Sequence, residues 1–147
     1  AQLKYPWDIV VDSSGAVYIS DSGNHCIRKV DAVTGLISTI AGTSIGGYTG
    51  DGILATAAQL YLPEGVFVDA LGTVYIADSG NYRIRKVDAV TGMISTIAGT
   101  GTWGYTGDGI LVAIRVGRKF DLPAFLAGVA GPEAARLARV RVVGFEP

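Results

Sequence analysis

A 57-residue internal repeat dominates this sequence. The tetrapeptide Asp21–Asn24 returns as Asp78–Asn81, and the run Ile27–Gly35 returns unchanged as Ile84–Gly92. Roughly two-thirds of the aligned positions are identical, which is far beyond chance for such a period. Self-similarity of this length is the signature of a repeat architecture, in which each unit buries its apolar surface against its neighbours.

Each unit is predicted to form four short β-strands. In the first copy they are expected at Ile9–Val11, Val17–Ser20, Cys26–Val30 and Leu36–Ala41. These runs are rich in β-branched and aromatic residues, and Gly, Asp, Asn and Ser separate them, as in strands joined by hairpins. The first strand is apolar at every position in both copies, which suits a strand covered on both faces. The pattern predicts an all-β fold, two tandem four-stranded antiparallel blades of an incomplete β-propeller.

The repeat divides the chain into three segments. We expect the first blade over residues 1–57, the second over residues 58–112, and a tail over residues 113–147 that no longer follows the repeat. The repeats hold ten of the 13 Asp and Glu but only six of the 12 Lys and Arg, so the tail is basic. It is an unrelated segment, a frameshifted third blade or a terminal cap, and the abrupt break favours the first two.

Composition argues against several classes of function. A formal net charge of -1 gives no bulk electrostatic reason to expect binding to nucleic acid. The single cysteine, Cys26, cannot form an intrachain disulfide, and no apolar run approaches the roughly 18 residues of a membrane span. The segment Ala1–Pro6 has neither an initiator Met nor the layout of a signal peptide. We therefore expect that the original start is missing, and the sequence leaves the localisation unknown.

A set of motifs in the second copy carries a family resemblance. These residues are Pro63, Gly65–Asp69, Gly72, Val74–Val87, Ile94–Thr100 and Gly104–Gly109. Together they resemble the NHL repeat, in the long-blade variant of bacterial secreted proteins and of the teneurin propeller. The first copy departs from the family pattern at Trp7-Asp8 and at Cys26. The resemblance implies a β-propeller and a secreted location, but it does not set the function, because one fold serves many functions.

Several polar turn residues recur in both copies. They are Asp21, Asn24, Asp51, Asp78, Asn81 and Asp108. A residue that every blade requires should recur, whereas a catalytic residue is usually needed once. One carboxylate and a Gly turn fall short of the about six to eight oxygens that Ca²⁺ prefers. We therefore expect each Asp to cap its own turn, with no metal site and no cofactor.

The sequence predicts no catalytic residue. His25 is the only histidine, and its counterpart in the second copy is Tyr82. Acid–base chemistry needs an oriented partner, and no Ser, His and Asp constellation can be assembled. Because Cys26 corresponds to Arg83, the repeat does not require a thiol there. The chain is therefore predicted not to be an enzyme.

Two sets of loops are expected on one side of the blades: the loop after the second strand and the long connection after the fourth. The candidate binding residues on this side are Trp7, Asp8, His25, Glu64, Tyr82 and Trp103. Aromatic residues mixed with polar ones are typical of interface centres. The leading hypothesis is a non-enzymatic binding or structural module that presents this loop face to a protein or another macromolecule.

Two blades cannot close a ring, because propellers need about four to eight. The open blade faces should be apolar patches, so either the chain is part of a longer propeller or it self-associates. Three chains would then give a six-bladed ring.

Two alternative functions remain open at this stage. The first is a propeller enzyme of the lyase or lactonase type with a metal at the axis, for which a symmetric assembly would have to bring several His25 side chains together. The second is an RNA-binding propeller, for which four basic residues would have to line one groove. They are Arg28, Lys29, Arg85 and Lys86, and each pair is expected instead to form a solvated strand face.

Overall fold

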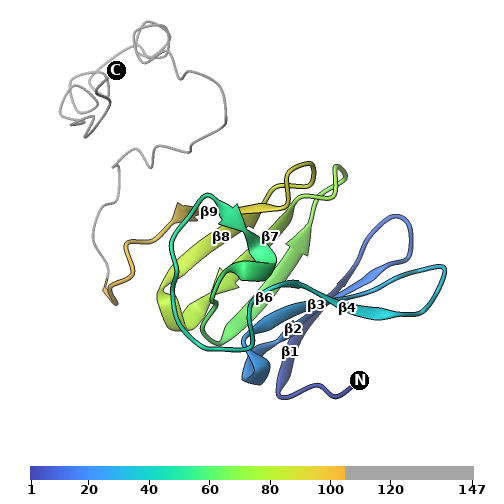
Figure 1. Ribbon diagram of the computed structural model, residues 1–147, viewed down its shortest axis with the longest axis horizontal. Coiled ribbons are helices and arrows are strands. Elements are labelled where there is room, and N and C mark those ends of the chain that lie inside the picture. The colour runs from blue at the N-terminus through green and yellow to red at the C-terminus, as the bar shows by residue number, and fades with distance from the viewer. Residues whose placement is uncertain (105–147) are drawn as a thin grey trace, which may run out of the picture. The chain divides into compact units, whose positions relative to one another are not determined.

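The computed structural model describes residues 1–104 as two antiparallel β-sheets without an α-helix (Figure 1). The first sheet has the order β1-β2-β3-β4 and contains β1 (Pro6–Val11), β2 (Val17–Asp21), β3 (Cys26–Val30) and β4 (Ile37–Ala41). The second has the order β5-β9-β8-β7-β6 and contains β5 (Ile53–Leu54), β6 (Pro63–Val68), β7 (Val74–Asp78), β8 (Arg83–Val87) and β9 (Met93–Ala98). The predicted all-β fold with tandem antiparallel blades is confirmed over these residues. The tail predicted at 113–147 lies outside them, as does Asp108.

The two copies fold alike, down to their irregularities. In both sheets a β-bulge interrupts the first pair of strands, between Pro6 and Ile9 and between Pro63 and Gly65. A three-residue 3₁₀ turn follows the second strand, as η1 (Ser22–Asn24) and η3 (Ser79–Asn81). The sequence period therefore corresponds to a repeated backbone conformation.

The sheet boundary does not coincide with the repeat boundary. Strand β5 belongs to the first 57 residues, yet it pairs with β9 of the second sheet, with Ile53 opposite Ile94 and Leu54 opposite Met93. The 3₁₀ turn η2 (Ala55–Ala57) then leads the chain towards β6. Strand β5 was not predicted, because two residues are too few to show a strand periodicity.

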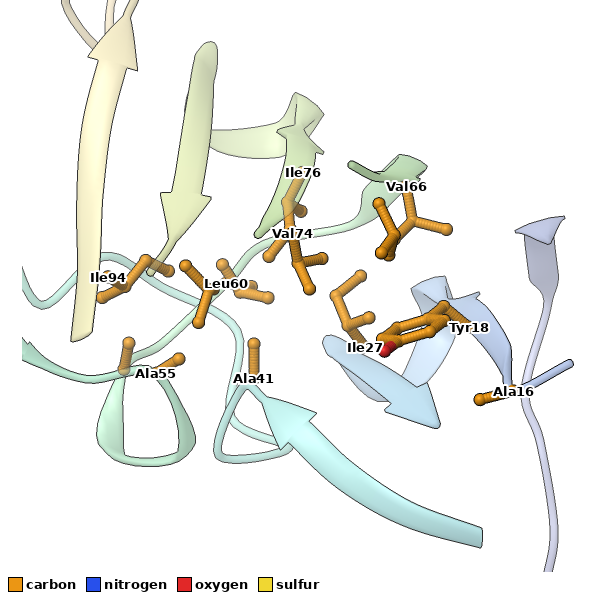
Figure 2. Packing of buried hydrophobic residues seen from close by; sticks show 13 residues of the cluster. Ala16, Tyr18, Ile27, Ala41, Ala55, Leu60, Val66, Val74, Ile76 and Ile94 are labelled. Carbon is orange, nitrogen blue, oxygen red and sulfur yellow. The ribbon is translucent and has the colours of Figure 1, made fainter. Parts of the chain in front are cut away.

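The hydrophobic core lies between the two sheets. Tyr18 and Ile27 of the first sheet point towards Val66, Val74 and Ile76 of the second (Figure 2). Alternate residues of a strand point to opposite faces, so each blade offers one apolar set to its neighbour and a second set to the other side. The first strand of each blade, β1 or β6, was predicted to be covered on both faces. Within residues 1–104 each of them is covered on one face only, since Ile9 is 63% exposed and Phe67 is 58% exposed.

Aspartate side chains stabilise the turns between β3 and β4 and between β8 and β9. Asp31 Oδ1 accepts hydrogen bonds from the Thr34 amide (2.8 Å) and the Val33 amide (3.1 Å). The Thr34 amide and hydroxyl stabilise the charged carboxylate and so hold the pKa of Asp31 below its usual value. The same arrangement recurs at Asp88, whose pKa the Thr91 amide and hydroxyl lower.

The core between the sheets should dominate stability. Ile27 is fully buried there, whereas Ile84, the same position of the repeat, is 39% exposed. Replacing Ile27 by Ala should lower the free energy of unfolding by about 2–4 kcal/mol, because it leaves a cavity between packed blades. Ile84→Ala should cost less than half as much. Urea unfolding of both variants at low protein concentration measures the difference, and equal losses would contradict this account of the core.

Candidate interaction surface

A buried aspartate anchors each blade to the segment that precedes it. Asp21 is fully buried, and its Oδ1 accepts a hydrogen bond from the backbone amide of Lys4 (2.7 Å). Asp78 is also fully buried and accepts from the amide of Tyr61 (2.8 Å). Neither side chain caps its own 3₁₀ turn, contrary to the sequence-based expectation. The carboxylates instead satisfy amides that lie 17 residues earlier in the chain.

Each buried carboxylate also meets an amide side chain and an arginine. Asn24 Nδ2 donates to Asp21 Oδ2 (2.9 Å), and Asn81 Nδ2 donates to Asp78 Oδ2 (2.9 Å). Arg85 is fully buried, and its Nη1 lies 3.3 Å from Asp78 Oδ2. The prediction that the Arg85 pair forms a solvated face is therefore wrong for Arg85, because the paired strands β7 and β8 place it beside this carboxylate.

Asp51 contacts the second blade and not its own turn. Its Oδ1 accepts from Arg85 Nη2 (3.1 Å) and from the Thr96 hydroxyl (2.9 Å). Arg85 Nη2 also donates to the carbonyl oxygen of Gly50 (2.7 Å). Asp51 therefore does not cap its own turn as expected. Its hydrogen bonds join the long connection after β4 to the second sheet.

The long connection after β4 lies against the turn that follows β7. Asn81 Nδ2 donates to the carbonyl oxygen of Gly47 (2.7 Å). The guanidinium carbon of Arg83 lies 3.9 Å from the centre of the Tyr48 ring, within the range of a cation–π interaction. Gly42 allows the sharp exit from β4, since it has a φ of 97° and a Cβ there would collide with the backbone of Cys26. We call this end of the blades the loop face.

Two of the candidate binding residues make contacts between the blades. Asp8 Oδ2 accepts from the amide of Val66 (3.0 Å). His25 Nδ1 accepts from the amide of Leu62 (3.1 Å), and its ring centre lies 5.4 Å from that of Tyr61. These side chains hold the second blade against the first through Asp8 Oδ2 and His25 Nδ1. This role was missed because it joins residues that are distant in sequence.

The other candidates lie at the surface. Trp7 is 68% exposed and Trp103 is 85% exposed. Tyr82 is exposed and Glu64 is partly buried. Tyr5, which was not predicted as a binding residue, is also exposed. The role of this surface in binding stays a prediction.

Residues 1–104 hold no group of three or more His, Cys, Asp or Glu side chains that could ligate a metal ion. The side chain of His25 faces Tyr61 and the Leu62 amide.

The helical turns in this part of the chain have three residues each, and none of them could cross a membrane.

The two buried aspartates, Asp21 and Asp78, should contribute differently to the free energy of unfolding. Within residues 1–104, Asp78→Ala leaves Asp51 as the one carboxylate within 4 Å of the buried Arg85 guanidinium and removes the acceptor of the Tyr61 amide, so it should lower the free energy of unfolding by about 3 kcal/mol. Asp21→Ala should cost less, since the Arg28 side chain retains 19% exposure and can be hydrated. Chemical denaturation of the two variants gives the comparison. A larger loss for Asp21→Ala would refute the assignment of Arg85 as the buried charge that needs a partner.

Comparisons with known proteins agree with this architecture. Residues 3–30 match the profile of the NHL repeat, and residues 46–106 match that of the teneurin NHL domain. Protein SUPPRESSOR OF QUENCHING 1, chloroplastic, from Arabidopsis thaliana is 37% identical over 65% of this chain and 9% of its own length. NHL repeat-containing protein 2 from Gallus gallus is 33% identical over 73% of this chain and 14% of its own length. Teneurin-1 from Mus musculus is 33% identical over 54% of this chain and 3% of its own length.

The chain thus spans only a small part of these relatives. Among solved structures, a structural genomics protein of unknown function from Bacteroides thetaiotaomicron superposes with a TM-score of 0.56 at 29% identity, over 65% of this chain and 24% of that one. The profile matches, the relatives named for the repeat and the paired antiparallel blades together show that this chain belongs to the NHL-repeat family.

Proposed function

We propose that this chain is a non-enzymatic propeller module, in which copies associate head to tail through their outer blade faces and present the loop face to a protein partner. One observation carries the proposal: positions that are buried between the two blades are open at the equivalent places on the outer faces. Burial of such exposed apolar surface in a contact between copies lowers the free energy of the assembly.

The outer face of the first blade is largely apolar, with Arg28 and Thr39 as its polar residues. We call it the leading face, and its residues are Ile9, Val11, Val17, Ile19, Val30 and Ile37. Their counterparts 57 residues later are buried against the first blade: Val66, Val68, Val74, Ile76, Val87 and Ile94. Ile9 and Val11 are 63% and 56% exposed, whereas Val66 and Val68 are 6% and 8% exposed. The leading face thus has the same apolar pattern as a surface that already packs on a blade.

The outer face of the second blade has the complementary pattern. We call it the trailing face, and its residues are Phe67, Tyr75, Ala77, Ile84 and Ala98. Their counterparts in the first blade are Val10, Tyr18, Ser20, Ile27 and Ala41, which face the core between the sheets. An open hollow of about 320 Å³ adjoins this face; its lining includes Ala77, Ile84 and Ala98. A leading face could therefore pack there as β6 packs on the first blade.

The same two faces meet in the contact between blades of one chain. Joining the trailing face of one copy to the leading face of the next repeats that contact, which makes a heterologous interface. Such an interface closes into a ring when the rotation allows, and propellers have about four to eight blades. Three copies of 15.2 kDa would supply six blades.

The loop face is the part of such a ring that stays free for another protein. Trp7, Tyr82 and Trp103 are exposed there and make none of the cross-blade hydrogen bonds described for Asp8 and His25. Aromatic side chains of this kind supply large contact areas at protein interfaces. Burial of Arg85 argues against the RNA-binding alternative, because this guanidinium is not available to a phosphate.

Blocking one face should limit assembly in a predictable way. Phe67→Glu places a charge on the trailing face, and Ile9→Glu places one on the leading face. Each variant alone should be monomeric in light scattering coupled to size-exclusion chromatography, whereas the unchanged chain should give about three times the monomer mass. An equimolar mixture should give a heterodimer, because each variant keeps one intact face and the two intact faces are complementary.

Matched controls separate assembly from folding and from the loop face. Val90→Glu alters a turn residue that is 93% exposed, and Trp103→Ala alters the loop face; both should keep the assembled mass. Circular dichroism checks that every variant keeps its sheets. If the unchanged chain stays monomeric up to high concentration, or if Phe67→Glu alone still forms a dimer, head-to-tail association is wrong.

A further inference from the structure

The segment that leads into the second blade is part of the contact between the blades. We call Ala58–Leu62 the entry segment of the second blade. Leu60 is fully buried and belongs to the same buried cluster as Ile27 of the first blade (Figure 2). The ring of Tyr61 lies beside that of His25, with 5.4 Å between their centres. The entry segment therefore supplies both an apolar and an aromatic contact to the blade before it.

The first blade has an entry segment of its own, Ala1–Tyr5. It begins with the same three residues as the entry segment of the second blade, and a proline follows each of them. Tyr5 has the same φ of 48° as Leu62, and the buried aspartate of each blade binds an amide of its entry segment. Leu3, however, is 40% exposed, whereas Leu60 is fully buried. The first entry segment thus has the same conformation as the second while its leucine is open to solvent.

The hollow that adjoins the trailing face corresponds to the place where the second entry segment lies on the first blade. Its lining includes Ile84 and Ala98. Their counterparts Ile27 and Ala41 are fully buried, in the cluster that contains Leu60. The hollow therefore offers an apolar surface at the place where a leucine packs in the first blade.

Two side chains differ between this hollow and its counterpart. Tyr82 stands in place of His25, and Lys4 stands in place of Tyr61. Lys4 and Tyr61 both lie against the glycine of the 3₁₀ turn in their own blade, so their side chains start from the same place. An ammonium group over a tyrosine ring makes a cation–π interaction. A contact between copies would thus exchange one aromatic pair for a cation–π pair.

The second blade presents the ring of Tyr82 on a fixed backbone. Tyr82 has a φ of 52°, its amide donates to the carbonyl oxygen of Ser79 (3.0 Å), and its side chain is 49% exposed. Arg83 also lines the hollow, but its guanidinium donates to the carbonyl oxygens of Asn81 and Thr100. A backbone that is already in place reduces the entropy lost on binding.

We propose that this hollow binds the entry segment of a second copy, with Leu3 against Ile84 and Ala98. The Lys4 ammonium group then lies over the ring of Tyr82. The proposal rests on the head-to-tail association proposed above and adds the pair of residues that makes it selective. Apolar faces alone accept many partners, whereas this pair requires a cation at one place of the leading copy.

The two face-blocking variants give a heterodimer with one junction, in which each copy has one part. The Phe67→Glu copy contributes its entry segment, and the Ile9→Glu copy contributes its hollow. Lys4→Ala should weaken the heterodimer about threefold to tenfold when the Phe67→Glu copy carries it, because a cation–π contact is lost. On the Ile9→Glu copy the same substitution should change the Kd by less than about twofold, which makes it its own matched control. Sedimentation equilibrium measures the Kd.

Tyr82→Ala should show the opposite dependence on the copy that carries it. With Lys4→Ala on one copy and Tyr82→Ala on the other, the loss should be no larger than with either alone, because the two side chains act as a pair. Lys4→Arg and Tyr82→Phe keep the cation and the ring, so they should keep the affinity. Both side chains are exposed in the single chain, so urea unfolding of each variant alone should be unchanged.

The outcomes distinguish this proposal from the one on which it rests. If the heterodimer forms but neither alanine substitution weakens it, or each does so on the wrong copy, the entry segment does not bind in the hollow and head-to-tail association stands. Losses that add would show that Lys4 and Tyr82 act separately, which overturns the pair. If no association occurs at any concentration, both proposals fail.

Discussion

The packing of one blade on the next is the constraint on which the rest of the structure depends. A four-stranded sheet whose strands are apolar on both faces cannot bury them by itself, so it needs neighbours. Here Tyr18 and Ile27 of one sheet meet Val66 and Ile76 of the other, and this contact forms the main core. The loops, the buried aspartates and strand β5 all lie around its edges. Their contacts across the two sheets form only when the sheets are stacked.

Apolar packing is not directional, so polar contacts must fix how the blades sit on each other. Asp78 ties the segment before β6 to the turn after β7, and Arg85 joins that carboxylate to Asp51 of the preceding connection. Each charged side chain of this network has a partner of opposite charge, which limits the cost of burying charge, although Nε of Arg85 donates no hydrogen bond within residues 1–104. A slip of one residue would break several of these bonds together. The network therefore sets the register that the core alone leaves open.

The sequence predicted the strands well, because β-branched runs bounded by Gly, Asp and Asn are local signals. It did not predict the partners of Asp51, Asp8 or His25, because these contacts join segments far apart in the chain, and a repeat period reports similarity and not proximity. Burial of Arg85 could have been inferred. Asp78 and Arg85 come near each other on the two strands of one hairpin, and a recurring acid–base pair among apolar strands indicates a buried ion pair.

The differences between the copies bear on how an assembly would form. Within the chain, the amides of Val66 and Leu62 are bound by the side chains of Asp8 and His25. At a contact between two copies, the residues in place of Asp8 and His25 are Gly65 and Tyr82, so these two hydrogen bonds have no equivalent. The contact inside the chain is therefore the stronger one. In the association proposed above, folding of the two-blade unit should come first, and that unit, not the single blade, would be the building block.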